Sequence, residues 1–205
     1  MQKLLIFPYN GNGLEASACL GKSMDLIGFV DDTPGKQGKT PHGHTVFGRE
    51  AFSKYKEALV LAVPGSPASY LQRKEIIEGL GINPSRFASV IHPSAQVSEM
   101  ARIGCNTLIM AGAVITSNAV IGNHTCILPN TVIHHDAEVG DYTLLGSNTV
   151  VAGSSRIGKN CYIGSGALLI GHIIIGDCTL VGMGAVVLNS LPAGAKAVGN
   201  PARII

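Results

Sequence analysis

The second half of the chain places an aliphatic residue at every sixth position. The series starts at Ile91, ends at Val187 and contains 17 residues, each of them Ile, Val or Leu. Such a period cannot keep side chains on one face of an α-helix, whose period is about 3.6 residues. It fits short strands separated by tight turns, with one aliphatic side chain per strand directed inward. The pattern therefore predicts a stack of short strands.

Two further positions of the six-residue unit are restricted. Glycine often follows the aliphatic residue, as at Gly104 and Gly122, and the fifth position holds a small residue or Thr, as at Ala95 and Thr107. Three strands would close one triangular coil of about 18 residues, and stacked coils would bury a continuous aliphatic column. We expect glycine to supply the backbone conformations of the corners. Small residues would fit a second inward position in a narrow interior.

The first 90 residues instead alternate short apolar runs with turns and helical stretches. They predict strands at 4–7, 26–30 and 59–63, and helices at about 14–22 and 67–80. Strand, Gly-rich turn, helix and strand make a βαβ unit of the Rossmann-like α/β type. Its turn and helix N-terminus can bring backbone N–H groups to a phosphate. The third glycine of a complete GxGxxG motif is missing, so the motif alone leaves nucleotide binding and an ordinary turn both open.

Composition excludes several functional classes. The chain is 46% hydrophobic and 14% charged, with a net charge of +2, and residues 103–135 carry no formal charge. Polar residues such as Asn106, Asn118 and Asn130 interrupt that stretch, so it lacks the run of about 20 apolar residues that a membrane span needs. The Lys and Arg residues are scattered, which predicts no nucleic-acid surface. With no export signal and no CxxC pair among its cysteines, we expect a soluble cytoplasmic protein.

Charge also divides the chain into two parts. Residues 1–90 hold 18 of the 28 charged side chains, and residues 91–205 hold 10. We therefore expect a small α/β domain over 1–90 and an all-β domain over 91–205. The six-residue pattern of the second part resembles the hexapeptide-repeat acyltransferases, and this resemblance implies a left-handed parallel β-helix.

The combination of a short βαβ unit with hexapeptide repeats is similar to the sugar acetyltransferases of the PglD/NeuD type. The resemblance implies that a homotrimer transfers an acetyl group from acetyl-CoA to an amino or hydroxyl group of a nucleotide-linked sugar. Three loops of the first domain would hold the nucleotide sugar. Their matching residues are Asn10, Gly11, Asn12, Gly13, Asp31, Asp32, Pro64 and Gly65. Asn12 stands where the family usually has a His; its amide can still hydrogen-bond to a phosphate or a sugar hydroxyl.

A charged cluster, His134-His135-Asp136, ends the uncharged stretch. It falls on a turn, so we expect it on the outer surface of the coil. Acetyl transfer from a thioester needs a base whose pKa lies near neutrality, which His supplies. A neighbouring carboxylate can orient the imidazole and stabilise the imidazolium. The resemblance implies that His135 is the general base, that Asp136 is its partner and that His134 is a flanking residue.

The resemblance further implies that acetyl-CoA lies in a groove between neighbouring subunits. A glycine amide one coil beyond the base would stabilise the oxyanion, and it corresponds to Gly153. The remaining expected cofactor contacts are Leu144, Ser165, Met183, Gly184, Gly199, Pro201 and Ala202. Leu144 replaces a His seen in some relatives. No metal is expected.

Other interpretations stay open. An O-acetyltransferase acting on sialic acid or another free sugar would share the same repeats, and a trimeric sugar-nucleotide-binding protein would use them only for assembly. A γ-type carbonic anhydrase would need, after His135, a pair of His residues about five positions apart as zinc ligands. In this chain His172 is followed five positions later by Asp177 and not by a His. A serine acetyltransferase would have a helical first domain, which the βαβ pattern disfavours.

Overall fold

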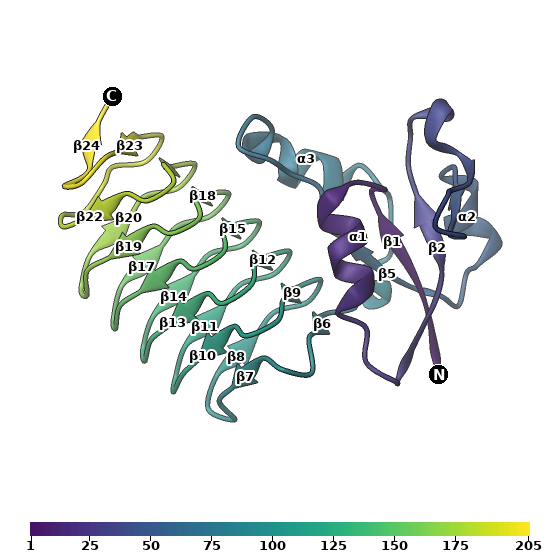
Figure 1. Ribbon diagram of the computed structural model, residues 1–205, viewed down its shortest axis with the longest axis horizontal. Coiled ribbons are helices and arrows are strands. Elements are labelled where there is room, and N and C mark those ends of the chain that lie inside the picture. The colour runs from purple at the N-terminus through teal and green to yellow at the C-terminus, as the bar shows by residue number, and fades with distance from the viewer.

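The computed structural model describes all 205 residues, with an α/β unit at one end and a long coil of short strands at the other (Figure 1). A five-stranded sheet with the order β3-β4-β2-β1-β5 forms the centre of the α/β unit. Its strands are β1 (Gln2–Phe7), β2 (Met24–Val30), β3 (Gly38–Lys39), β4 (Thr45–Phe47) and β5 (Leu59–Ala62). All neighbours pair in parallel except β3 and β4.

Three short helices accompany this sheet: α1 (Gly11–Ala18), α2 (Glu50–Lys54) and α3 (Arg73–Glu78). Single 3-10 turns lie at Pro34–Lys36, Tyr70–Gln72 and Pro84–Arg86. The longest helix has eight residues, and none of the helices reaches the length and hydrophobicity of a membrane span.

Two helices differ in extent from the sequence prediction. Helix α1 begins at Gly11, before the predicted start, because the Asn10 side chain accepts a hydrogen bond from the Gly13 N–H at 2.8 Å and caps the first turn. The predicted helix over 67–80 is helical only in α3 and the 3-10 turn before it, because the hydroxyls of Ser66 and Ser69 lie 2.9 Å apart and close a separate turn. Strands β3 and β4 were not predicted, since such short segments show no alternation.

The coil is a parallel β-helix whose strands have two residues each, or three in β23, and are arranged as three faces. The docked face, which contacts the α/β unit, contains β6 (Val90–Ile91), β9 (Leu108–Ile109), β12 (Cys126–Ile127), β15 (Leu144–Leu145), β18 (Tyr162–Ile163), β21 (Leu180–Val181), β23 (Lys196–Val198) and the antiparallel β24 (Arg203–Ile204). The open face contains β7 (Gln96–Val97), β10 (Val114–Ile115), β13 (Val132–Ile133), β16 (Val150–Val151), β19 (Leu168–Leu169) and β22 (Val186–Val187). The third face contains β8 (Arg102–Ile103), β11 (Val120–Ile121), β14 (Glu138–Val139), β17 (Arg156–Ile157) and β20 (Ile174–Ile175).

Paired strands on one face are 18 residues apart, as between Val114 and Val132, so one coil contains three hexapeptides. The predicted aliphatic column fills the interior from Ile109 onward, and the small residues of the fifth position are buried beside it. Buried hydroxyls in the same column bond to corner carbonyls, for example Thr131 Oγ1 to Gly146 O at 2.9 Å. Ile91, the first residue of the series, is 43% exposed because it belongs to the terminal coil and has a neighbouring coil on one side only.

The expectation that glycine shapes the corners is wrong for the glycines that follow the aliphatic residues. The left-handed residue of most corners lies two positions later and is usually polar, for example Asn118 (φ 60°) and Asp136 (φ 58°). Gly122 and Gly140 are needed for another reason. A Cβ on either residue would lie 2.6–2.7 Å from backbone atoms of the next coil. These glycines allow the coils to stack closely, and short polar side chains make the turn.

The α/β unit packs on the first strands of the docked face, β6, β9, β12 and β15, through one hydrophobic cluster. Leu4, Ile6 and Phe29 of its sheet pack with outward residues of the β-helix that include Leu108 and Leu144. The interior of the β-helix and this interface are thus separate cores on opposite sides of the same strands.

A buried polar joint extends this interface at the vertex between the third and docked faces, which we name the Tyr142 vertex. The Asn106 amide bonds to both the N–H and the C=O of Ala62, at 2.7 and 2.9 Å, and its nitrogen lies 3.0 Å from His124 Nδ1. The His124 ring stacks on Tyr142, with centroids 4.7 Å apart and planes 8° from parallel. These contacts fix the end of β5 against the β-helix.

We predict that acid weakens this joint through His124. Burial holds the pKa of His124 below its usual value of 6.5, with Arg73 adding to the effect and the carboxylates of Asp141 and Glu78 opposing it. The unfolded chain then binds a proton at His124 more readily than the folded chain does. The stability that neutral His124 contributes is therefore complete above about pH 6.5 and is lost as the pH falls below that value.

The test compares melting temperatures at about pH 7.5 and about pH 5.5. The wild type should lose more on acidification than His124→Asn, in which Asn tolerates the left-handed φ of 57°. His42→Asn, at an exposed histidine, should keep the wild-type pH dependence. Equal pH dependence of the wild type and His124→Asn would refute the prediction.

Candidate active site

His135 and Asp136 lie together on the vertex between the open and third faces, which we name the His135 vertex. His135 Nδ1 is 2.8 Å from Asp136 Oδ2, and the two side chains are 63% and 49% exposed. The cluster is on the outer surface, as expected from its position on a turn. The left-handed conformation of Asp136 follows the same corner geometry as the rest of the helix.

Asn118, one coil earlier on this vertex, holds the other carboxylate oxygen. Its Nδ2 donates to Asp136 Oδ1 at 3.0 Å. The hydrogen bond from His135 and then that from Asn118 lower the pKa of Asp136, so the carboxylate is ionised and only accepts hydrogen bonds. His135 Nδ1 must then carry the proton of this contact, which leaves Nε2 of a neutral imidazole free to accept one. Sequence reasoning missed Asn118, although the 18-residue coil places it next to Asp136.

Gly153, one coil further on, lies directly against the His135 ring. A Cβ at this position would lie 2.7 Å from both Cε1 and Nε2 of the imidazole. The backbone N–H of Gly153 donates to no acceptor within the chain. The vertex therefore combines a free basic nitrogen with a free backbone donor.

A second cluster of predicted residues forms a cleft of about 400 Å³ at the carboxyl ends of β1, β2 and β5. Five of the eight residues assigned to the nucleotide sugar line it: Asn10, Asp31, Asp32, Pro64 and Gly65. The other three, Gly11, Asn12 and Gly13, form the first turn of α1 beside it. Asn12 Nδ2 donates to Gly65 O at 3.3 Å and so connects the first and third loops.

Two cations of this cleft were not found by sequence analysis. Lys36 Nζ lies 2.9 Å from Asp31 Oδ2, and Arg49 makes a two-pronged contact with Asp32, at 2.6 and 2.8 Å. Burial alone would raise the pKa of Asp31, but the Thr33 N–H and Lys36 together hold it below its usual value. Neither cation belongs to a sequence motif. Their only signal is a mixed-charge segment between strands, which is typical of many solvent-exposed loops.

The residues expected at the cofactor fall in two places. Ser165, Met183 and Gly184 share the vertex between the docked and open faces, where the Gly184 N–H bonds to Ser165 O at 2.9 Å. This is named the Gly184 vertex. The terminal segment Gly199, Pro201 and Ala202 folds over the last coil, because Ala202 N–H bonds to Val186 O and Val186 N–H bonds to Gly199 O. Leu144 is only 2% exposed and lies in the interface with the α/β unit, on neither vertex.

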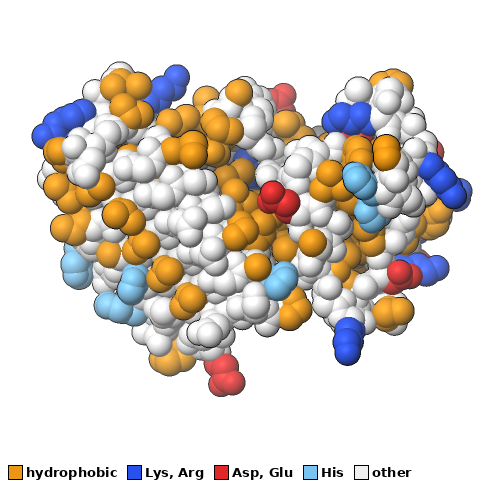
Figure 2. All heavy atoms as spheres, in the orientation of Figure 1, with side chains coloured by type: hydrophobic (Ala, Val, Ile, Leu, Met, Phe, Trp, Pro, Cys, Tyr) orange, Lys and Arg blue, Asp and Glu red, His pale blue; other side chains and the backbone are white.

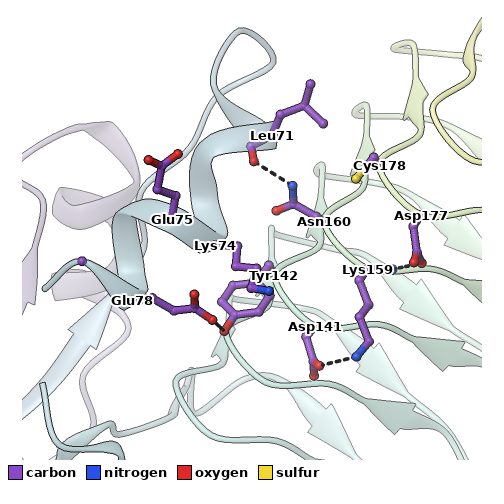
Figure 3. A pocket seen from close by; sticks show the side chains of 11 residues that line it. Leu71, Lys74, Glu75, Glu78, Asp141, Tyr142, Lys159, Asn160, Asp177 and Cys178 are labelled. Carbon is purple, nitrogen blue, oxygen red and sulfur yellow. Dashed lines mark hydrogen bonds and ion pairs between the residues drawn. The ribbon is translucent and has the colours of Figure 1, made fainter. Parts of the chain in front are cut away.

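A larger cavity, of about 830 Å³, separates α3 from the Tyr142 vertex (Figure 3). Hydrogen bonds cross it from Tyr142 to Glu78 and from Asn160 to Leu71, and Lys159 pairs with Asp141 on its β-helix side (Figure 3). None of the predicted site residues lines it. No three His, Cys, Asp or Glu side chains of the chain are arranged to hold a metal ion.

Comparisons with known proteins agree with this architecture. The bacterial transferase hexapeptide (six repeats) family matches residues 100–135, 118–153 and 154–189. No curated protein matches the chain by sequence. A mutant of perosamine N-acetyltransferase from Caulobacter crescentus, in complex with CoA and GDP-perosamine, superimposes with a TM-score of 0.87 at 26% identity, covering 100% of this chain and 97% of that one.

Two further structures match over the whole chain. The acetyltransferase domain of PglB from Neisseria gonorrhoeae, in complex with acetyl coenzyme A, has a TM-score of 0.86 at 26% identity and covers 100% of this chain and 99% of that one. WeeI from Acinetobacter baumannii has a TM-score of 0.83 at 27% identity and covers 100% of both chains. The fold expected from the sequence, an α/β unit followed by a left-handed β-helix of hexapeptide repeats, is confirmed.

We predict that Asn118→Gly raises the pKa of Asp136 toward its usual value without abolishing the shift, because the His135 contact remains. Glycine is chosen because position 118 has a φ of 60°. The titration of Asp136 would be measured by NMR of the side-chain carboxyl carbons in protein with ¹³C-labelled Asp. The control is Asn148→Gly, at a left-handed corner without contact to His135 or Asp136, and it should leave the pKa of Asp136 unchanged. If Asn118→Gly also leaves the pKa of Asp136 unchanged, the prediction is contradicted.

Proposed function

Because the chain is an acyltransferase of the hexapeptide-repeat superfamily, similar to sugar acetyltransferases of the PglD/NeuD type, we propose that it transfers the acetyl group of acetyl-CoA to an amino or hydroxyl group of a nucleotide-linked sugar. The observation that carries the proposal is the exposed His135–Asp136 pair, held by Asn118 and covered on one side by the Gly153 backbone. Known ligands of similar proteins support both substrates: CoA with GDP-perosamine in one, and acetyl coenzyme A in another.

The proposed reaction is a direct transfer. The acceptor nitrogen or oxygen attacks the thioester carbonyl carbon and loses its proton to His135 Nε2, while Asp136 stabilises the resulting imidazolium. The Gly153 N–H donates to the oxyanion of the tetrahedral intermediate. Collapse breaks the carbon–sulfur bond, and the imidazolium returns the proton to the departing CoA thiolate. His135 ends neutral, and no covalent enzyme intermediate is required.

The cleft of the α/β unit suits a nucleotide sugar. Lys36 and Arg49 can approach a diphosphate, and the first turn of α1 offers N–H groups at a helix N-terminus. The carboxylates of Asp31 and Asp32 can accept hydrogen bonds from ribose or sugar hydroxyls. Binding a phosphate would require Lys36 or Arg49 to share its present contact with an aspartate. In this cleft the carboxylates of Asp31 and Asp32 therefore position Lys36 and Arg49 for a phosphate.

One chain alone does not bring the cleft to the base. The α/β unit packs on the docked face, and the His135 vertex is the corner opposite that face in the triangular cross-section. The cofactor residues on the Gly184 vertex are separated from His135 by the width of the open face. Three copies that turned their open faces toward a common axis would place the His135 vertex of each copy beside the Gly184 vertex of the next.

The open face has the surface that such an assembly needs. Its outward positions are Gln96 followed by Val114, Val132, Val150, Leu168 and Val186. Leu168 is 44% exposed, and Ile170 and Leu188 beside it are each 49% exposed. Figure 2 shows hydrophobic side chains in separate groups on the side of the β-helix that is turned to the viewer. A continuous apolar strip of this kind is typical of a protein–protein interface. We propose that it is the trimer contact.

The central experiment is an acetyl-transfer assay with acetyl-CoA and a panel of nucleotide-linked amino and hydroxy sugars. His135→Asn should lower kcat by roughly 100- to 10,000-fold, the usual contribution of a general base. KM for both substrates should change little, because the imidazole acts on a proton that moves in the transition state. His134→Asn, at the exposed neighbour, should keep wild-type kcat.

The outcomes separate the possible functions. Full activity in His135→Asn would remove His135 from the chemistry. Binding of nucleotide sugars without acetylation of any of them would favour a non-catalytic sugar-nucleotide-binding protein. Acetylation only of free sugars would favour the O-acetyltransferase alternative.

A second prediction concerns the sharing of one site by two chains. His135→Asn has an intact cleft, whereas Arg49→Glu has an intact base but lacks one of the cations that the cleft offers to a diphosphate, so neither homotrimer should be active. Co-expressed at equal levels, the two variants should recover roughly a quarter of wild-type activity, since half of the clefts and half of the bases are intact and their pairing is random. The measurement is specific activity of the mixed oligomer.

The control is a mixture of the separately purified variants without subunit exchange, which should stay inactive. A co-expressed oligomer without activity, although its mixed composition is verified by mass spectrometry, would place cleft and base in the same chain and contradict the proposal.

A further inference from the structure

Arg73 is fully buried, with 0% of its surface exposed, and it forms no ion pair. Its guanidinium donates instead to three backbone carbonyls. Nη2 bonds to His124 O at 2.7 Å, Nε bonds to Tyr142 O at 2.9 Å, and Nη1 bonds to Pro64 O. Two of these acceptors are on the β-helix and the third is in a loop that lines the cleft. One side chain thus connects the cleft to the Tyr142 vertex.

The loop that Arg73 holds is closely fitted to it. Gly65 has a φ of 130°, and a Cβ there would lie 2.9 Å from Arg73 Cδ and 3.0 Å from Arg73 Nη1. The carbonyl of Gly65 is held on the other side by Asn12. Pro64 and Gly65 therefore lie between the turn of α1 and the buried guanidinium, so a shift of Arg73 must move the wall of the cleft.

Packing alone does not account for an arginine here. A buried charge without a counter-ion is unfavourable, and an apolar side chain would fill the same volume at lower cost. The planar fork of arginine can satisfy three carbonyls in fixed directions, which a lysine ammonium cannot reproduce. The three carbonyls belong to segments far apart in sequence, at 64, 124 and 142.

We propose that Arg73 is a positioning residue for the nucleotide-sugar cleft: it fixes the Pro64–Gly65 loop against the β-helix and so sets the affinity for the nucleotide portion of the substrate. The inference rests on the function proposed above for this cleft. Arg73 itself is buried behind the loop and acts through it.

The chain provides a matched control in Arg86. This arginine also donates to three carbonyls, those of Phe52, Tyr55 and Ala58, at 2.9–3.0 Å. All three acceptors lie within the α/β unit, and Arg86 does not line the cleft. Arg73→Lys and Arg86→Lys therefore remove similar hydrogen bonds, but only the first loosens the cleft loop.

The experiment measures steady-state kinetics and calorimetric binding of GDP, UDP and dTDP to the assembled full-length protein. Arg73→Lys should raise KM for the nucleotide sugar, and Kd for the nucleoside diphosphate that the wild type binds, by roughly tenfold, comparable to the loss of one charge-assisted hydrogen bond. Both kcat and KM for acetyl-CoA should stay within about twofold. Amide hydrogen exchange should accelerate over residues 63–66. Arg86→Lys should lower the melting temperature and leave Kd and exchange at 63–66 unchanged.

The failures are distinguishable. A wild type that binds none of the three nucleotides refutes the proposed function of the cleft. A wild type that binds one of them, together with an Arg73→Lys variant that binds it equally well, refutes the positioning role even if the variant is less stable. Should Arg73→Lys not fold, Arg73→Gln takes its place. If neither folds while Arg86→Lys does, Arg73 is required for the fold itself, and the positioning role is rejected.

Discussion

The stacking of each coil directly on the next is the constraint on which the rest of the structure depends. Parallel strands 18 residues apart leave room for two inward side chains per hexapeptide, one aliphatic and one small. They also force backbone against backbone at the corners, where only glycine fits beside the next coil at positions such as 122 and 140. Because every coil repeats this geometry, residues 18 apart form columns. This repetition places Asn118 next to Asp136, and His135 next to Gly153. The regular stacking of coils therefore fixes the His135–Asp136 pair, and no additional structural element is needed.

The second level of organisation is the attachment of the α/β unit, and it is built differently. Its apolar part uses outward positions of the docked face, but the polar part depends on individual side chains that the repeat does not require. Asn106, His124 and Tyr142 occupy the left-handed corner positions of three successive coils on the Tyr142 vertex. Their contacts with Ala62 and Arg73 fix the ends of β5 and α3. Since the cleft is made from those ends, its shape depends on corners of the β-helix.

The periodic part of the structure could be predicted from the sequence, and the individual contacts could not. An uninterrupted series from Ile91 to Val187 has few solutions, so the aliphatic column, the three strands per coil and the exposure of His135 and Asp136 followed from it. The role of the glycines was misjudged because a close approach between coils and a left-handed φ both favour glycine, and sequence does not separate the two. Lys36, Arg49 and Arg73 were missed because their partners are carboxylates or carbonyls brought together only by folding. Leu144, expected at the cofactor, lies in the interface between units.

The contrast between two faces of the same β-helix supports a functional reason for the low charge of the chain. The fold imposes the same inward pattern on both faces and leaves the outward positions free. On the third face these positions include Arg102, Glu138 and Arg156, whereas on the open face they are aliphatic from Val114 to Val186. The fold therefore does not explain the apolar open face, whereas the proposed contact with other copies would. Such contact would also cover the exposed vertices at its two edges, and a thioester that must react with a sugar rather than with water needs that cover. In the proposed assembly, the uncharged face and the exposed His135 would thus have one common cause, a site closed by contact between copies.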